Sequence, residues 1–259
     1  SYTMASAPFL ADLADSEALD VSDVSSFRIF CSAGAPIPRI LVETATERLG
    51  ANILSGWGMT ENGLVTTTRP EDPAEKIFNT DGAAIANNAV RIVDPDGDPM
   101  TANTVGRLQA QSIGMFVGYL KRPDACETYD GWFETGDLAR MDEDGYIRIV
   151  GRAKDIIIRG GENVPVVEVE ELIYRHPAVH DVAVVAMPDE RLGERGCAFV
   201  QTNAGANFTF DAMIEHLLEA GMSKTYLPER LELVDEFPRT ASGKIQKFEL
   251  REIAKGFSV

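Results

Sequence analysis

The segment PRTASGKIQK, residues 238–247, places Lys244 after a Ser-Gly turn and just before a pattern typical of a helix. A lysine side chain is a long arm that ends in a compact positive charge, so it can lie between two anionic oxygens and hold them together. Most lysines in loops are simply solvated, however. The segment alone leaves both interpretations open.

Two other segments combine small residues with polar groups. In SGWGMTENG, residues 55–63, two glycines flank Trp57, and Thr60 and Glu61 follow. One interpretation is a turn whose aromatic side chain packs against the core. The other is a nucleotide-binding floor, with a hydroxyl for phosphate and a carboxylate for a metal ion. In CSAGAPIP, residues 31–38, small residues after a predicted strand allow the backbone to approach a planar ligand closely, although a plain tight turn explains them too.

A fourth segment, residues 129–155, carries an aspartate and an arginine. Asp137 follows Thr135-Gly136 in a predicted tight turn, and Arg152 lies fifteen residues later, just past a predicted hairpin. A carboxylate suits the cis-diol of a ribose because it accepts hydrogen bonds from both hydroxyls. An aspartate in an Asx-turn with a surface arginine is the alternative.

The composition argues against several classes of protein. Lys and Arg total 24 against 41 Asp and Glu in 259 residues, a formal charge of −17, which disfavours binding to nucleic acid. Cys31, Cys126 and Cys197 are far apart and form no C-x-x-C motif, which argues against a zinc knuckle or a disulfide framework and fits a reducing cytoplasm. The most apolar short run, residues 182–187, is much too short to span a membrane.

The elements that must position these residues can be predicted from hydrophobic periodicity. The first third has an α/β pattern, with strands over 26–34 and 51–58 and a helix over 39–49. From about residue 80 to 150 the pattern becomes short strands with turns at Asp96-Gly97 and Asp144-Gly145, which predicts an antiparallel meander, either a small barrel or a sheet.

After a hinge-like passage over 151–155, helices and strands alternate as in a compact α+β unit. We expect helices over 166–176, over 209–221 and from about 246, and strands over 180–188, 195–203 and 229–237. The second helix has Thr209 or Asp211 near its start, Gly221 at its end, and Met213, Leu217 and Leu218 at core spacing.

The histidines and cysteines are assigned ordinary roles. His176, His180 and His216 show neither triad nor metal spacing. The three cysteines have no neighbouring base in the sequence, so none is predicted to be a nucleophile.

Taken together, GWGMTE, TGDLA, GRAKDIIIRGGENV and PRTASGKIQK resemble, in wording and order, the acyl-adenylate-forming superfamily of AMP-dependent acyl-CoA synthetases and ligases. The sequence around GWGMTENG and GYLKRPDA is most similar to that of ligases for short- or medium-chain fatty acids and for alicyclic acids of the cyclohexanecarboxylate type.

The resemblance implies a role for each matching position. Trp57 would stack on adenine, Thr60 would contact the α-phosphate, Glu61 would hold Mg²⁺, and Asp137 would bind the ribose hydroxyls with help from Arg152. The implied ATP and AMP contacts are Gly34, Ala35, Pro36, Gly56, Trp57, Gly58, Met59, Thr60, Asp137, Ile149, Arg152 and Lys244.

The implied reaction has two steps, and Lys244, Thr60 and Glu61 are the implied catalytic residues. A carboxylate attacks the α-phosphorus of ATP and expels pyrophosphate, and the thiol of coenzyme A then displaces AMP to form a thioester. Lys244 serves only the first step. Lys154 is the implied pivot. A rotation there would replace Lys244 in the active site with the loop of Gly160 and Gly161, which would line the path of the pantetheine arm.

The implied architecture is an α/β part with a small β-barrel or meander, followed by a mobile α+β lid. Residues 1–151 would be the C-terminal part of the large adenylate-binding domain, 152–155 the hinge, and 156–259 the lid. The family's Ser/Thr/Gly-rich phosphate loop is not found here, so we expect a fragment that is inactive in adenylation on its own.

Two smaller departures from the family pattern are that Pro165 lies one position early and that Trp57 replaces the commoner tyrosine. The alternatives to a cytoplasmic CoA ligase are an adenylating enzyme that loads a carrier protein and a non-catalytic docking module for a basic partner.

Overall fold

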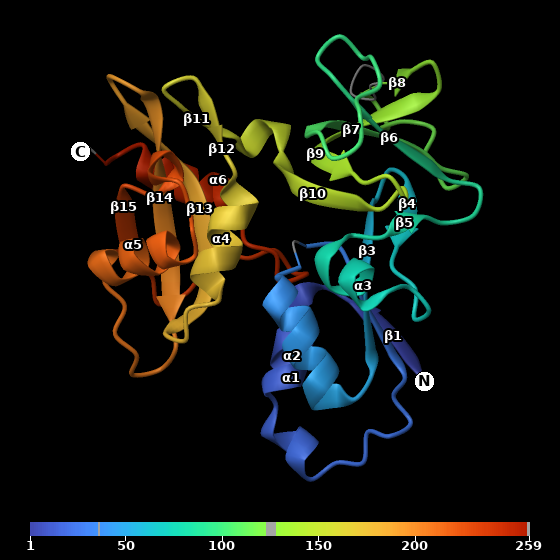
Figure 1. Ribbon diagram of the computed structural model, residues 1–259, viewed down its shortest axis with the longest axis horizontal. Helices are drawn as coiled ribbons and strands as arrows, with labels where there is room; N and C mark the ends of the chain where they lie inside the picture. The colour runs from blue at the N-terminus through green and yellow to red at the C-terminus, as the bar shows by residue number, and fades with distance from the viewer. Residues whose placement is uncertain (36, 123–127, 258–259) are drawn as a thin grey trace. The chain divides into compact units, whose positions relative to one another are not determined.

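The computed structural model describes residues 1–35, 37–122 and 128–257. The chain divides into two compact units, Ser1–Val150 and Gly151–Val259, and each unit is described by itself (Figure 1).

The first sheet of unit 1 has the strand order β1-β2-β3-β4-β5. Strands β1, β2 and β3 are parallel, whereas β4 and β5 continue the sheet antiparallel. The strands are β1 (Tyr2–Ala5), β2 (Ile29–Ser32), β3 (Asn52–Met59), β4 (Gly63–Thr67) and β5 (Ala83–Ala84). The helices of this part are α1 (Ala7–Asp15), η1 (Glu17–Asp20), α2 (Arg39–Leu49) and α3 (Ala74–Asn79).

Helices α1 and α2 lie side by side against this sheet (Figure 1). Leu10 of α1, Val42 and Ala45 of α2 and Ile53 of β3 belong to one buried cluster, each at most 1% exposed. The helix predicted over 39–49 is confirmed with the same bounds, and it ends at Gly50 in the left-handed conformation that favours glycine.

The second sheet of unit 1 is an open meander with the order β10-β9-β7-β6, with β8 beside β9. Its strands are β6 (Ala89–Val93), β7 (Gly106–Gln111), β8 (Thr128–Tyr129), β9 (Trp132–Met141) and β10 (Ile147–Arg152). The barrel alternative is therefore wrong. Beyond β9, β10 bonds instead to the segment before β5: Asp81 N–H donates to Ile147 O over 2.8 Å, and Ile147 N–H donates to Gly82 O over 2.9 Å.

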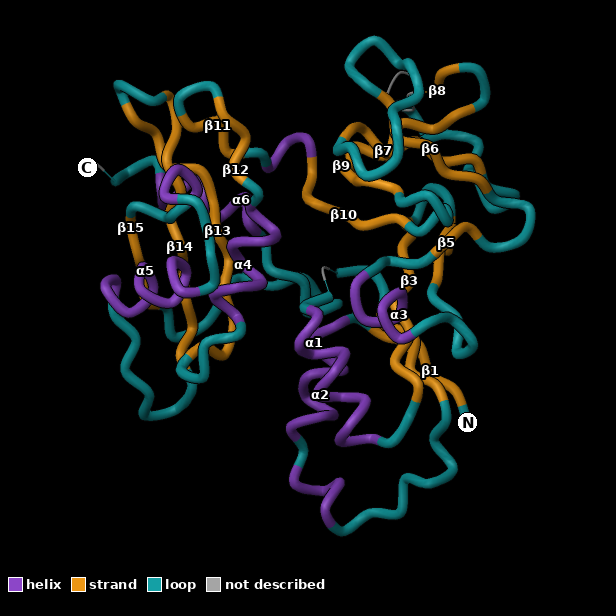
Figure 2. The backbone as a smooth tube through the Cα atoms, viewed as in Figure 1, coloured by secondary structure: helices purple, strands orange, loops and turns teal. Residues whose placement is uncertain are grey.

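Unit 2 is built around a sheet with the order β12-β11-β14-β13. Strand β15 runs parallel to β14, on the side of β14 opposite β13. The elements are η3 (Ala153–Asp155), β11 (Ile157–Arg159), β12 (Glu162–Val164), α4 (Val166–Tyr174), β13 (Val179–Asp189), β14 (Gly193–Thr202), α5 (Phe210–Glu219), η4 (Lys224–Tyr226), β15 (Arg230–Leu233) and α6 (Lys247–Ala254). Figure 2 shows helices and strands alternating along this unit.

Strand β13 sends alternate side chains to opposite faces of the sheet. Val182 and Val184 join the cluster formed with α4 and α5, whereas Ala183 and Val185 join the cluster that contains Leu250 of α6. The sheet is therefore covered by α4 and α5 on one face and by α6 on the other.

Two details of unit 2 differ from the sequence predictions. Leu218 is 40% exposed, so its assignment to the core is wrong, whereas Met213 and Leu217 are fully buried as predicted. The strand predicted over 229–237 is shorter, Arg230–Leu233. Of the two residues predicted near the start of α5, Thr209 is the N-cap, because its hydroxyl accepts a hydrogen bond from Ala212 N–H over 3.2 Å, and Asp211 lies in the first turn.

Candidate functional site

The segment SGWGMTENG forms the β3–β4 hairpin, with Trp57 inside strand β3. Gly58 pairs with Leu64 across the hairpin, and a Cβ at Gly58 would lie 2.0 Å from Gly63 O. The glycine after the tryptophan is therefore required by the close approach of the two strands themselves.

Trp57 connects this hairpin to the second sheet. Its side chain is only 8% exposed, and it packs with Val65, Leu108 and Ile147. The indole N–H donates a hydrogen bond of 2.8 Å to Oδ2 of Asp137, which is itself 7% exposed. A buried carboxylate is thus held by a buried indole donor that lies eighty residues away in the sequence.

Asp137 lies within strand β9, so the predicted tight turn at this position is wrong. The inward residues of β9 alternate through Phe133, Thr135, Asp137 and Ala139. The pairing with β7 shifts register across this stretch, and Gly136 has a φ of +71°, a conformation that favours glycine. This irregularity in the strand explains why the Thr-Gly-Asp sequence resembles a turn.

We expect the indole donor of Trp57 to stabilise the folded chain. Replacing Trp57 with phenylalanine is expected to lower the free energy of unfolding by about 1.5–3 kcal/mol, the cost of losing a hydrogen bond to a charged group. Urea denaturation measures this loss. Trp132→Phe is the matched control, since the Trp132 ring faces the Arg91 guanidinium at 4.5 Å. Equal losses in the two variants would contradict the role assigned to the indole N–H.

The turn of the hairpin carries Thr60 and Glu61. Thr60 is exposed and Glu61 is partly buried. Asn62, which the sequence analysis did not single out, is fully buried, and its Oδ1 accepts a hydrogen bond of 2.9 Å from Met59 N–H. The Tyr119 hydroxyl donates a hydrogen bond to Oε1 of Glu61. The Glu61 carboxylate is thus oriented by a contact from a distant loop.

The other predicted nucleotide contacts in unit 1 lie on two segments. Gly34 and Ala35 follow strand β2, and Gly34 has a φ of +81°. Pro36 lies outside the described residues. Ile149 is in β10, and its backbone N–H donates a hydrogen bond of 2.8 Å to Oδ2 of Asp81.

Asp81 belongs to a buried ion pair that the sequence analysis missed. The Arg39 Nη2 donates to Asp81 Oδ1 over 2.7 Å, and the two side chains are 4% and 9% exposed. Arg39 Nη1 also donates to Thr80 O over 3.0 Å. This network joins α2, the segment before β5 and β10.

The predicted residues of unit 2 lie in separate segments. Gly160 and Gly161 form the turn between β11 and β12, and both have positive φ values, +60° and +90°. Arg152 ends β10, and Lys154 lies exposed in η3.

Lys244 lies in the exposed loop between β15 and α6. This loop is closed by its own hydrogen bonds: Thr240 N–H donates to Lys244 O over 2.9 Å, and Lys244 N–H donates to the Thr240 hydroxyl over 3.2 Å. Thr240 and Lys244 thus close a short ordered turn, and Lys244 lies at one end of it.

A magnesium site would rest on few protein ligands. Within the described part of the chain, no group of three or more His, Cys, Asp or Glu side chains is placed to hold a metal ion. Magnesium in nucleotide sites is commonly held by one or two carboxylates together with the substrate phosphates and water. The single partly buried carboxylate of Glu61 fits that kind of site.

The histidines include one close pair. The rings of His176 and His216 lie 5.1 Å apart, edge to face, and a ring nitrogen of His216 is 2.8 Å from Leu172 O. Burial and the neighbouring His216 lower the pKa of His176.

The two described cysteines are buried and are expected to be unreactive in the folded chain. Burial raises the pKa of the Cys31 thiol and raises that of Cys197 to about 12. Because the thiolate is the nucleophile, we expect iodoacetamide at pH 8 to leave both unmodified in the native chain and to label both in urea. Peptide mass spectrometry measures the labelling. Rapid labelling of either residue in the native chain would contradict its burial.

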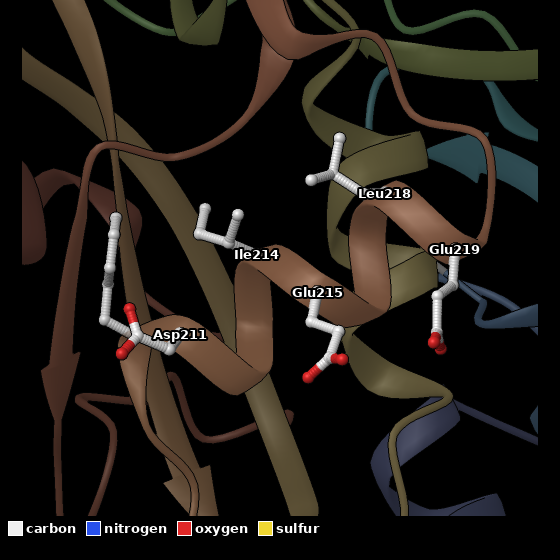
Figure 3. A pocket seen from close by; sticks show the side chains of 6 residues that line it. Asp211, Ile214, Glu215, Leu218 and Glu219 are labelled. Atoms are coloured by element: carbon white, nitrogen blue, oxygen red, sulfur yellow. The ribbon is translucent and has the colours of Figure 1, made fainter.

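A shallow groove follows one side of α5 in unit 2 (Figure 3). It is lined by Phe210, Asp211, Ile214, Glu215, Leu218 and Glu219. None of the lining residues belongs to the motifs of the sequence analysis, so we do not assign the groove to the candidate active site.

In the part of the chain that the structure describes, we find no helix with the length and apolar character needed to cross a membrane.

Comparison with solved structures identifies the class of protein. MatB from Rhodopseudomonas palustris with bound ATP superposes with a TM-score of 0.90 at 29% identity, over 99% of this chain and 51% of that one. The o-succinylbenzoate CoA synthetase MenE from Bacillus subtilis, in complex with its acyl-adenylate intermediate, superposes with a TM-score of 0.84 at 26% identity, over 100% of this chain and 51% of that one. The fold is that of adenylate-forming enzymes.

Family profiles and a curated relative agree with this class. Residues 1–120 match the AMP-binding enzyme family, and residues 168–244 match the C-terminal domain of AMP-binding enzymes. The chain belongs to the AMP-binding enzyme family, within the acyl-adenylate-forming superfamily. It is 37% identical over 249 residues to a medium-chain fatty-acid–CoA ligase of Escherichia coli, which covers 95% of this chain and 44% of that protein. The chain spans about half the length of the curated relatives it matches.

Proposed function

We propose that this chain is the C-terminal portion of an ATP-dependent, AMP-forming carboxylic acid–CoA ligase that works in the cytoplasm. The observation that carries the proposal is the β3–β4 hairpin, which presents Thr60 and Glu61 at its turn while its Trp57 holds the carboxylate of Asp137. A hydroxyl, an oriented carboxylate and a second fixed carboxylate are the groups that phosphate, a magnesium ion and a ribose require.

In the proposed site, the nucleotide is held mainly by unit 1. Asp137 accepts hydrogen bonds from the ribose hydroxyls, assisted by Arg152, and Thr60 donates to the α-phosphate. The remaining proposed nucleotide contacts are Gly34, Ala35, Pro36, Gly56, Trp57, Gly58, Met59 and Ile149. Magnesium, when bound at Glu61, supplies positive charge that offsets the charge of the phosphates.

The first half-reaction must bring anions together. A carboxylate is a poor acyl donor, because its leaving group would be oxide, and attack on the α-phosphorus of ATP converts it to a mixed anhydride while pyrophosphate leaves. We assign to Lys244 the charge that offsets the repulsion between the carboxylate and the phosphate oxygens during this attack.

In the second half-reaction, the thiol of coenzyme A attacks the carbonyl carbon and AMP leaves with its bridging oxygen. We assign the path of the pantetheine arm to the turn of Gly160 and Gly161, and the change between half-reactions to rotation at Lys154. In this proposal residues 1–151 end the large domain, 152–155 form the hinge, and 156–259 form the mobile lid.

The proposed substrate class is a short- or medium-chain fatty acid or an alicyclic acid. The experiment measures AMP release by the full-length enzyme with a panel of acids, with and without coenzyme A. The proposal predicts AMP and a thioester only when coenzyme A is present, and the acid with the highest kcat/KM identifies the substrate. Acyl-adenylate that coenzyme A does not discharge would contradict the CoA ligase and favour a carrier-protein acceptor.

A further inference from the structure

The Lys244 loop is held at both of its ends by ion pairs, one to strand β13 and one to helix α4. The loop begins after Arg239 and ends before Lys247, and each of these cations binds a carboxylate that lies outside the motif. The role inferred for these ion pairs deepens the proposed function and rests on it, because it concerns how Lys244 is positioned for adenylation.

At the first end of the loop, the Arg239 side chain binds two different segments. Its Nη2 donates to Oδ2 of Asp181 on β13 over 2.5 Å, and its Nη1 donates to the backbone oxygen of Gly243 over 2.9 Å. The planar guanidinium thus links the sheet directly to the peptide that precedes Lys244. Backbone pairing between Arg239 and Ile245 closes the base of the loop.

At the second end, Lys247 begins helix α6. Its Nζ lies 2.6 Å from Oε1 of Glu170 on α4, with side chains 22% and 13% exposed. Burial raises the pKa of Glu170, and the neighbouring Lys247 opposes that rise. The pair fixes the start of α6 three residues after Lys244.

The two carboxylates are themselves fixed by the same strand edge. Among the described strands, β13 lies at the edge of its sheet, so alternate N–H groups of β13 face away from the neighbouring strand β14. Val182 N–H donates to Oδ1 of Asp181 over 2.8 Å, and Val184 N–H donates to Oε1 of Glu170 over 2.6 Å. Each carboxylate therefore accepts a hydrogen bond from one backbone N–H and forms an ion pair with one of the two cations that flank the loop.

We propose that Asp181 and Glu170 are positioning residues for adenylation, which hold the Lys244 loop at both ends through Arg239 and Lys247. Removing either carboxylate leaves Lys244 present and charged but loosens the turn that carries it. Misplacement of a catalytic group by about 1 Å can slow a reaction about a hundredfold.

The test measures both half-reactions of the full-length enzyme for Asp181→Asn and Glu170→Gln. We expect each variant to slow acyl-adenylate formation by roughly tenfold to a hundredfold, while thioester formation from supplied acyl-adenylate stays within about twofold. Asp181→Glu, which keeps the charge, is expected to recover most of the adenylation rate. The spared second half-reaction shows that the variants fold.

The control is Glu232→Gln, which removes a partly exposed ion pair of the same unit, with Arg230 at 2.6 Å, away from the Lys244 loop. An equal fall in both half-reactions, or no fall in either, would overturn the positioning role. Lys244→Ala distinguishes the role of Lys244 in adenylation from the positioning role of the two carboxylates. If the unmodified enzyme forms no acyl-adenylate, the proposed function fails. If Lys244→Ala adenylates normally, the role assigned to Lys244 fails, and the positioning role fails with it. If it adenylates slowly while both carboxylate variants are normal, only the positioning role fails.

Discussion

Replacing Lys244 with alanine is expected to slow acyl-adenylate formation by about 10²–10³-fold, the usual cost of removing one group that stabilises transition-state charge. Thioester formation from preformed acyl-adenylate should change little, because no anions need to be brought together in that step. The measurement follows each half-reaction of the full-length enzyme separately, with pyrophosphate exchange for the first and AMP release from supplied adenylate for the second.

Lys255→Ala is the matched control for this variant. It removes one lysine from the same end of unit 2, where Lys255 forms an exposed pair with Glu252 at 2.6 Å. An exposed pair contributes little, so we expect both half-reactions to be unchanged. Equal losses in both half-reactions of Lys244→Ala would contradict the role in adenylation and indicate a general structural role for this lysine.

Replacing Asp81 with alanine is expected to lower the free energy of unfolding of unit 1 by about 3–5 kcal/mol, because it leaves the buried Arg39 charge without its carboxylate. The loss also removes the acceptor for Ile149 N–H. Urea denaturation of the chain, followed by the fluorescence of Trp57 and Trp132, measures the change.

Asp81→Asn and Asp20→Ala complete this experiment. The first keeps an acceptor oxygen at the site and should cost less than alanine. The second removes a carboxylate from an exposed ion pair. The side chain of Arg48 is 41% exposed and that of Asp20 is 61% exposed. We expect a loss of at most about 1 kcal/mol there. Equal losses for Asp81→Ala and Asp20→Ala would contradict the energetic importance of burial at Asp81.

The local elements could be predicted from the sequence because their signals are local. The helix over 39–49 has its apolar residues at helical spacing and ends at Gly50, and the structure has the same bounds. The helix that begins after Thr209 carries its own N-cap. The choice between a barrel and an open sheet depends on what bonds the outer edge of β10, and that partner lies near Asp81, far away in the sequence.

The residues of the candidate site could be identified from the sequence motifs, but their hydrogen-bond and ion-pair partners could not. Trp57 and Asp137 were each assigned to a nucleotide site, yet nothing local indicates that they bond to each other across eighty residues. The Arg39–Asp81 pair, forty-two residues apart, was missed for the same reason. The prediction of a turn at Asp137 was wrong because a glycine with positive φ occurs in an irregular strand as well as in a turn.

The most direct test of the central claim, acyl-adenylate formation, traces the carboxylate oxygens of the acid. The full-length enzyme is given its preferred acid labelled with ¹⁸O in both carboxylate oxygens, together with ATP and coenzyme A, and the products are analysed by mass spectrometry. If a carboxylate oxygen attacks the α-phosphorus and the thiol later breaks the carbonyl–oxygen bond, each AMP carries one ¹⁸O. Label in pyrophosphate or inorganic phosphate, or unlabelled AMP, would contradict the account.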